Sequence, residues 1–150
     1  MTFIPENYPA HWKQFSEYVR FERAQNKCEQ CNAPNNTVIE RGYLGELPIW
    51  FDGNGGTFCA KSGEYLGTFH SYDLDKLRVS RIVLTVAHLD HEGGICDCKQ
   101  IYGFKCAKPS HCLALCQSCH LSLDRPHHLK VQAENRAIKK DAQRGLLEFV

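Results

Sequence analysis

The chain has 150 residues, of which 43% are hydrophobic and 23% are charged. These values are ordinary for a soluble globular protein, and the length suits one domain with one core. The formal net charge of +1 at pH 7 does not by itself indicate a nucleic-acid binder, so any basic surface has to be local.

Cysteine and histidine are the unusual part of the composition, with 9 Cys beside 8 His. The sequence shows no basic leader followed by a long apolar run, and no apolar run of the ~20 residues that span a membrane. We therefore expect a cytoplasmic protein without membrane association, whose cysteines bind metal rather than form disulfides. A secreted disulfide protein is the less favoured alternative.

The first predicted element is a helix over residues 9–25. Trp12, Phe15 and Val19 recur at helical spacing and form one apolar stripe. Pro9 is tolerated because it falls in the first turn. We interpret the stripe as core packing.

Two Cys-x-x-Cys pairs follow at a distance from each other. Cys28 and Cys31 form the first pair, and Cys116 and Cys119 form the second. A turn between two such cysteines points both sulfurs inward, so two pairs complete a closed tetrahedral site. The spacing therefore predicts a structural zinc; a redox pair would need a thioredoxin-like context, which the flanking sequence lacks.

Residues 37–72 read as an inserted β segment. Short β-prone runs alternate with glycine-rich turns, and the last two form a hairpin. Cys59 is interpreted as a small buried hydrophobe. The segment serves either substrate recognition or decoration, and decoration is the simpler reading. The predicted strands cover residues 38–41, 47–51, 57–60 and 65–69.

An apolar run over residues 81–87 predicts a strand buried on both faces. A charged linker with Asp73, Asp75, Lys76 and Arg78 precedes it. His88 emerges at the end of the strand, where a single histidine would more often be structural.

The loop over residues 92–112 contains four further cysteines. We expect them to hold a second structural zinc, with His111 as an alternative to Cys112 for the fourth ligand. The competing interpretation is a mobile loop with free thiols. The four cysteines are Cys96, Cys98, Cys106 and Cys112.

The C-terminal part is predicted to be helical. His120 and Asp124 fall four residues apart, one turn above another, where both can meet one divalent ion. Pro126 is expected to interrupt this helix, and a last helix is expected from Leu129 to a stop at Gly145. This last helix either follows nucleic-acid phosphates or presents a solvated face. Its basic residues are Lys130, Arg136, Lys139, Lys140 and Arg144.

These motifs together resemble the HNH endonucleases. The resemblance lies in His11-Trp12-Lys13, Phe21-Glu22-Arg23-Ala24, Cys28-x-x-Cys31, residues 84–91, residues 114–121 and a trailing Asp124-x-x-His127-His128, typical of a phage and bacterial branch. It implies one α+β nuclease domain over residues 1–150. The implied fold is a ββα-metal (His-Me finger) core with a zinc knuckle, terminal helices and a small β-hairpin insertion.

The resemblance also implies roles for single residues. His88 takes the place of the general base and His120 that of a catalytic-metal ligand. His111 stands where many members have Asn, and Ala87 stands where a ligating Asp is common. Completion of the catalytic site would then fall to the remaining candidate ligands, which are Asp90, His91 and Asp124.

The expected function is a metal-dependent endonuclease that acts on double-stranded DNA, with Mg²⁺, Mn²⁺ or Ni²⁺ for catalysis and two structural Zn²⁺ ions. A phage packaging protein is a conceivable partner. One alternative is a catalytically inactive, zinc-stabilised nucleic-acid-binding module. Another is a structural zinc protein of a larger phage or repair assembly.

Overall fold

A computed structural model describes residues 5–90, 96–103 and 105–148. The chain is mixed α+β, with an antiparallel sheet, a C-terminal helix and clustered cysteines. Backbone proximity divides it into two units, Met1–His120 and Leu121–Val150, and each is described by itself. Within the described residues, no helix has the length and apolar character needed to cross a membrane.

The N-terminal helix confirms the predicted apolar stripe. Phe15 is 8% exposed and Val19 is fully buried, and Trp12 packs against the same cluster. The α-helical part passes directly into a π-helical turn, and the helix ends where Gln25 takes a left-handed φ of 53°. The bounds are η1 Pro5–Asn7, α1 Trp12–Glu17 and η2 Tyr18–Arg23.

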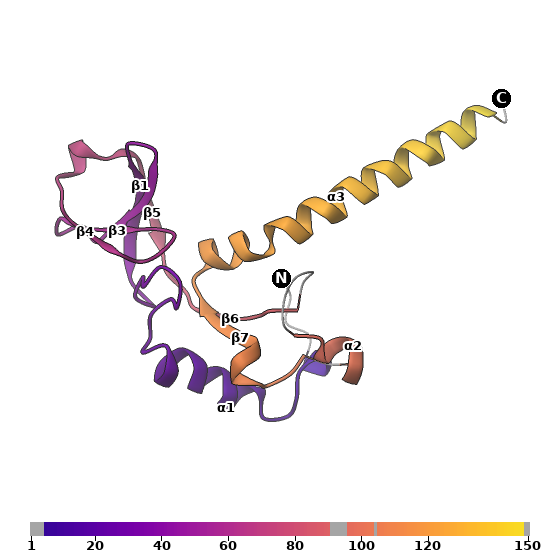
Figure 1. Cartoon of the computed structure of the whole chain (residues 1–150), viewed down its shortest axis with the longest axis horizontal. Helices are drawn as coiled ribbons and strands as arrows, with labels where there is room; N and C mark the ends of the chain where they lie inside the picture. The colour runs from indigo at the N-terminus through magenta and orange to yellow at the C-terminus, as the bar shows by residue number, and fades with distance from the viewer. Residues whose placement is uncertain (1–4, 91–95, 104, 149–150) are drawn as a thin grey trace. The chain divides into compact units, whose positions relative to one another are not determined.

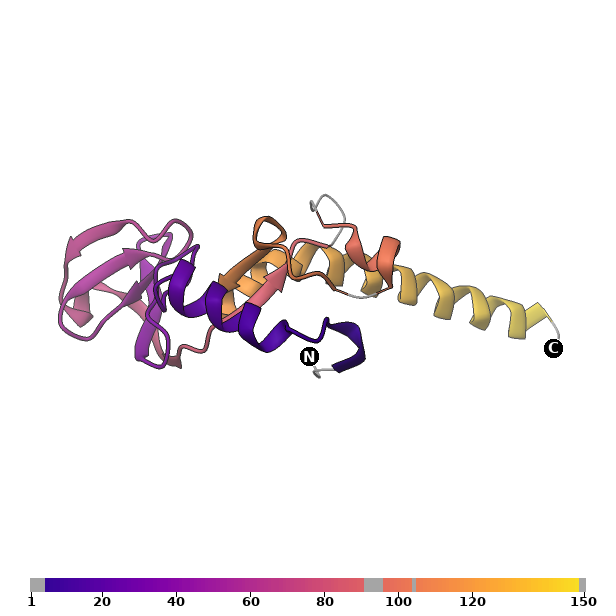
Figure 2. The ribbon, with the colours of Figure 1, turned by 90° about the horizontal axis from the view of Figure 1, so that it is seen from below.

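The inserted segment contributes four strands to a five-stranded antiparallel sheet (Figures 1 and 2), and the fifth strand, β5, lies beyond the predicted end of the segment at residue 72. The strand order is β4-β3-β2-β1-β5. The hairpin predicted for the last two strands of the segment is confirmed, since β3 and β4 pair antiparallel. Ile49, Phe51 and Leu74 form a buried cluster under it. The bounds are β1 Val38–Leu44, β2 Leu47–Phe51, β3 Gly56–Cys59, β4 Tyr65–Thr68 and β5 Asp75–Arg81.

The predicted charged linker is wrong over most of its length. Asp75, Lys76 and Arg78 lie in β5, and only Asp73 precedes it, in the short η3 helix Ser71–Asp73. β5 is at the edge of the sheet and pairs with β1 alone. Charged side chains are common on such edges because they discourage pairing with another chain.

One row of side chains crosses four strands of this sheet in register. Arg41 lies opposite Trp50, Trp50 opposite Phe58, and Phe58 opposite Tyr65. The Trp50 and Phe58 rings stack with centroids 4.1 Å apart and planes 9° apart. Paired residues of neighbouring strands share one face of a sheet. The row therefore runs on one face from buried Arg41 and Trp50 to Tyr65, which is 57% exposed.

The predicted continuous strand over residues 81–87 is wrong, because the chain changes sheets within it. β5 ends at Arg81, and β6 Thr85–His88 belongs to a separate two-stranded sheet. Ile82 and Leu84 are buried in the connection, while Val83 between them is 42% exposed. The predicted burial on both faces holds for Ile82 and Leu84 but not for Val83 and Thr85, which are exposed, and apolar content alone did not distinguish a strand from a connection.

β6 pairs antiparallel with β7 Cys112–Leu115, with His88 opposite Cys112 and Thr85 opposite Leu115. The connection between the two strands contains α2 Cys98–Tyr102 and η4 Pro109–His111. After β7, one residue, Cys116, leads into α3 Gln117–Glu148.

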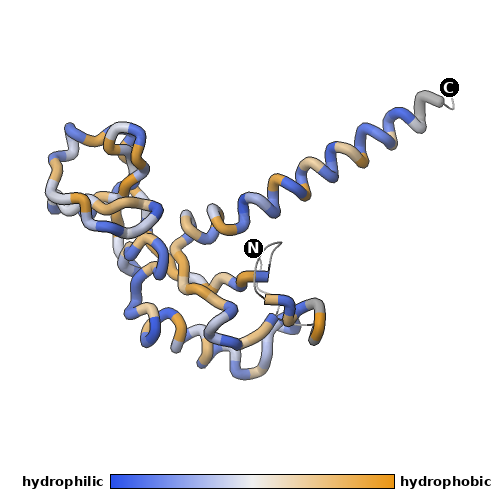
Figure 3. Tube along the Cα trace, viewed as in Figure 1, coloured by the Kyte–Doolittle hydropathy of each residue, from blue (hydrophilic) through white to orange (hydrophobic). Residues whose placement is uncertain are grey.

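Helix α3 corrects two predictions. It continues through Pro126 without a break and passes the expected stop at Gly145. Good helix formers on both sides of the proline, such as Leu123 before it and Leu129 after it, offset the hydrogen bond that proline cannot donate. Polar residues dominate the helix, as its mostly blue colour shows (Figure 3), and residues 128–144 are exposed throughout.

Candidate metal centres

The four cysteines of the two Cys-x-x-Cys pairs come together as predicted. Their sulfurs all lie within 4.8 Å of one another, and none of the four residues is more than 4% exposed. The Sγ atoms of Cys31 and Cys116 are 3.7 Å apart. A tetrahedral zinc with Zn–S bonds of about 2.3 Å separates its sulfurs by about 3.8 Å, so the cage has the size for this ion. We call this group, Cys28, Cys31, Cys116 and Cys119, centre 1.

The turn between Cys28 and Cys31 positions the first two sulfurs of centre 1. The backbone N–H of Cys31 donates to the Cys28 Sγ at 3.5 Å, and the N–H of Asn32 donates to the Cys28 carbonyl at 2.9 Å. Asn26 and Asn32 have left-handed φ angles of 60° and 62°, which asparagine tolerates better than most residues. The asparagines around the cysteines were thus a local sequence signal for this turn.

The inserted sheet is attached to centre 1 through its in-register row. Arg41 Nη2 donates to the Cys116 Sγ at 3.3 Å, and Trp50 Nε1 donates to the Cys31 carbonyl at 2.8 Å. Two neighbouring members of the row thus contact two ligand residues. The segment therefore supports the candidate metal centre through these two contacts.

Arg41 is also a buried charge, with 8% of its surface exposed. A guanidinium stays protonated in proteins and requires an anionic or strongly polar partner when buried. Four thiolates around one divalent ion leave a net charge of −2, which the Arg41 cation offsets in part. Hydrogen bonds among the four sulfurs lower the pKa of Cys28 and Cys116 and raise the pKa of Cys31 and Cys119.

A second group of four donors forms in the connection between β6 and β7. The Sγ atoms of Cys96 and Cys106 are 3.5 Å apart, and His111 Nδ1 lies 3.6 Å from the sulfurs of both Cys98 and Cys106. All four ligand atoms lie within 4.8 Å of one another. We call this group, Cys96, Cys98, Cys106 and His111, centre 2.

The structure brings His111, the predicted alternative, into the group of centre 2, and places Cys112 in a different group of donors. Cys112 is the first residue of β7, and its side chain joins the apolar cluster of Phe15, Val19 and Ala114. Cys112 and Ala114 are two residues apart in a strand and face the same side. His111 lies before the strand, in η4, where its ring can turn toward the loop cysteines.

His88 is buried next to centre 2 rather than exposed to solvent. It is 4% exposed, and its ring stacks on Trp12 with centroids 5.1 Å apart. Its Nε2 lies 2.7 Å from the Cys106 carbonyl oxygen. A carbonyl only accepts, so Nε2 carries the ring proton and Nδ1 is the basic nitrogen. Burial lowers the pKa of His88.

His88 also belongs to a third group of donors. A ring nitrogen of His88 and the sulfurs of Cys106 and Cys112 lie within 4.8 Å of one another. The three residues are 4%, 6% and 2% exposed. Cys106 therefore participates in two groups at once.

His120 lies at the other end of β6. It is in the first turn of α3, and its Nδ1 lies 2.9 Å from the Thr85 Oγ1. Thr85 and His88 are three residues apart, about 10 Å in a strand, and an odd spacing places them on opposite faces. No group of three donors in the described part of the chain contains His120. Ala87 shares the face of Thr85 but has no ligand atom.

The remaining predicted ligands are distributed as follows. Asp90 lies 3.9 Å from the Lys105 Nζ, through its Oδ2. Asp124 is on α3, one turn after His120 in the same helix, and is 4% exposed. His91 lies outside the described residues.

The predicted phosphate-contacting residues are all exposed on α3. Arg136, Lys139 and Lys140 are spaced three and four residues apart and therefore share one side of the helix. Glu134 and Asp141 are exposed as well, so the basic character is local and moderate. The predicted set is Lys130, Arg136, Lys139 and Lys140.

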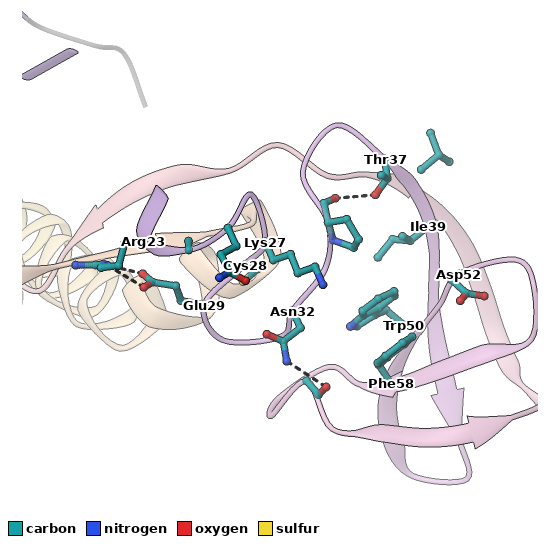
Figure 4. A pocket seen from close by; sticks show the side chains of 15 residues that line it. Arg23, Lys27, Cys28, Glu29, Asn32, Thr37, Ile39, Trp50, Asp52 and Phe58 are labelled. Carbon is teal, nitrogen blue, oxygen red and sulfur yellow. Dashed lines mark hydrogen bonds and ion pairs between the residues drawn. The ribbon is translucent and has the colours of Figure 1, made fainter. Parts of the chain in front are cut away.

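A cavity of about 780 Å³ lies between the Cys28 turn and the first strands of the sheet (Figure 4). Its polar lining is largely engaged within the protein: Arg23 pairs with Glu29 at 2.7 Å, and Asn32 donates to the Gly63 carbonyl at 3.3 Å. Neither His88 nor His120 lines it. The cavity is therefore separate from the histidines that the sequence identified.

Comparison of the chain with protein-family models, curated proteins and solved structures gave no match.

Proposed function

We propose that this chain is a metal-dependent endonuclease of the HNH type, which hydrolyses phosphodiester bonds of double-stranded DNA. The proposed ββα-metal core consists of β6, β7 and the first turns of α3. The hairpin, the single residue Cys116 and the helix follow one another in the order that this core requires. His88 ends the first strand and His120 begins the helix, as in the motif that the sequence resembles.

The contact between His88 and the Cys106 carbonyl carries this proposal. With the ring proton held on Nε2 at 2.7 Å from that oxygen, Nδ1 is left to accept a proton from water. The attacking oxygen then forms its bond to phosphorus as the bond to the leaving oxygen breaks. Centre 2 fixes the carbonyl through the Cys106 sulfur, so its metal would orient the base without taking part in the reaction.

His120 is the proposed ligand for a catalytic divalent ion. Its Nδ1 lies 2.9 Å from the Thr85 Oγ1, and this contact orients the ring. Asp124, one helical turn further along α3, is the proposed carboxylate partner. Such an ion, Mg²⁺, Mn²⁺ or Ni²⁺, supplies charge stabilisation to the phosphate and the leaving oxygen.

A second candidate is a zinc-stabilised nucleic-acid-binding module without catalysis. Two observations favour it. His88 is only 4% exposed. His88 also lies on the face of β6 opposite Thr85, the residue that His120 contacts. Ala87, on the same face as Thr85, offers no ligand to an ion at His120. Under this proposal the exposed basic residues of α3 contact phosphate, and a phage packaging protein is a further proposed partner.

Plasmid cleavage separates the two candidates. Supercoiled plasmid is incubated with the protein and Mg²⁺, Mn²⁺ or Ni²⁺, and His88→Ala and His120→Ala are compared with His70→Ala, an exposed histidine outside both centres. The nuclease proposal predicts cutting by the wild type and His70→Ala and a loss of about 10²-fold or more for the other two. Zinc content is measured for each variant to show that centres 1 and 2 are intact.

The same proteins are tested for binding to labelled duplex DNA by fluorescence anisotropy. If the proteins bind DNA and none of them cuts it, the binding module is supported and the nuclease proposal is rejected. Equal cutting by wild type and His88→Ala indicates a contaminating nuclease. Absence of both cutting and binding rejects both candidates.

A further inference from the structure

The Cys106 sulfur is surrounded by more metal donors than one ion can use. Centre 2 contributes three partners, and two more donors approach from the β6–β7 hairpin. His88 and Cys112 are directly opposite each other in that hairpin, so the strand register itself brings the two side chains to one place. The six donors are Cys96, Cys98, Cys106, His111, His88 and Cys112.

The charge of this cluster changes with the number of ions. One divalent ion in centre 2, with three thiolates and a neutral histidine, leaves a net charge of −1 in a buried region. A second divalent ion, with Cys112 as a thiolate and His88 neutral, makes the six-donor cluster neutral. Lys105 and Asp90, the described charges near His88, pair with each other and leave this balance unchanged. Burial is least costly for a neutral cluster.

One ring nitrogen of His88 makes a contact that is common among metal-binding histidines. Metal-binding histidines commonly donate their other ring N–H to a backbone carbonyl. His88 makes such a contact through Nε2 to Cys106, so Nδ1 is the nitrogen left for an ion. Cys112, 2% exposed and excluded from centre 2, supplies the second donor, and the shared Cys106 sulfur the third.

We propose that His88, Cys106 and Cys112 form a second metal position for a thiophilic divalent ion such as Zn²⁺, with the Cys106 sulfur bridging it to centre 2. Binding deprotonates the Cys112 thiol and releases that proton to solvent, and no electrons are transferred. Three protein donors leave the fourth position of the ion to water, so this position binds more weakly than the closed centres and fills last. Because the ion occupies the Nδ1 of His88, it inhibits cleavage; this part rests on the proposed nuclease function.

Metal stoichiometry tests the position without reference to activity. Protein holding its two zinc ions is titrated with further Zn²⁺ and examined by native mass spectrometry, and a parallel titration with Co²⁺ follows the thiolate-to-metal absorption band. Wild type is expected to take three ions and Cys112→Ala two. Cys59→Ala, a buried cysteine outside all three groups, is the matched control and should take three.

Cys112→Ser is measured beside Cys112→Ala because the residue also packs in the core. The serine keeps nearly the same volume but is a much poorer ligand, so it too should stop at two ions. Saturation of wild type at two ions, or a third ion in both Cys112 variants, overturns the proposal.

Cleavage is then measured as added Zn²⁺ increases, each protein relative to its own rate without added Zn²⁺. Wild type and Cys59→Ala are expected to lose at least 10-fold in rate as the third ion binds, and Cys112→Ala to keep its rate. A third ion that binds without slowing cleavage upholds the metal position and rejects His88 as the base. If no protein cleaves DNA, the nuclease proposal fails, while the stoichiometry still decides the metal position.

Discussion

Arg41 Nη2 and Cys116 Sγ lie 3.3 Å apart and join the five-stranded sheet to centre 1. Trp50, opposite Arg41 in the sheet, makes a parallel contact with the carbonyl of Cys31. A buried cation and a cluster of thiolates each lower the cost of burying the other. Folding of the inserted segment and loading of the metal are therefore expected to be linked.

Removal of the Arg41 charge should weaken zinc binding at centre 1. Partners that contact metal ligands typically contribute about 10- to 100-fold to affinity, so Arg41→Met is expected to lose affinity in that range. Competition with a chromogenic chelator measures it. Arg78→Met is the control, because Arg78 is the exposed cross-strand neighbour of Arg41. Equal affinities for the two variants would mean that Arg41 contributes packing alone.

Dialysed protein should contain two zinc ions per chain, and removing them should unfold it. Closed zinc sites provide folding free energy directly, on the order of 10 kcal/mol in zinc-finger peptides at neutral pH. Elemental analysis gives the count. A strong chelator should abolish the cooperative thermal transition, followed by Trp fluorescence and circular dichroism. A content of one ion, with full structure, would remove centre 2.

Cys116→Ser should abolish cooperative melting, because it removes one ligand of centre 1 and the acceptor of the Arg41 hydrogen bond. Cys59→Ser, a change of the same kind at a buried cysteine outside all donor groups, should still melt cooperatively. Differential scanning calorimetry distinguishes them. A normal transition for Cys116→Ser would show that the fold does not depend on the ion.

His111→Ala should reduce the zinc content of dialysed protein from two ions to one. Cys112→Ala should retain two, since Cys112 lies outside centre 2. The reverse result would restore Cys112 as the fourth ligand. The two residues are adjacent in the chain, at the junction of η4 and β7, but only His111 belongs to centre 2.

Pro126→Ala should stabilise α3. A proline inside a helix costs up to ~3 kcal/mol relative to alanine, since it lacks the N–H and crowds the preceding turn. Far-UV circular dichroism should show equal or greater helix content and a higher melting temperature. Arg125→Ala, at the exposed neighbouring position, serves as the control. Loss of helix in Pro126→Ala would mean that the proline is required where it stands.

Features governed by local spacing were predictable from the sequence. The Cys-x-x-Cys turns, the apolar stripe of α1 and η2 and the β3–β4 hairpin each depend on a few adjacent residues and on backbone geometry that recurs among proteins. The four ligands of centre 1 followed from this, because two knuckles of that spacing have few other uses.

Only the tertiary structure determined the features that depend on the face of a strand on which a side chain lies. A shift of one residue reverses the face of a strand side chain; the strand directed Cys112 toward the apolar cluster of Phe15 and placed His88 and Thr85 on opposite sides of β6. The strand pairing of Arg41 and Trp50, and the change of sheets after Arg81, likewise depend on partners far away in the chain. The sequence determined which side chains can bind a metal and how they are spaced, whereas the strand register determined which of these side chains lie close together.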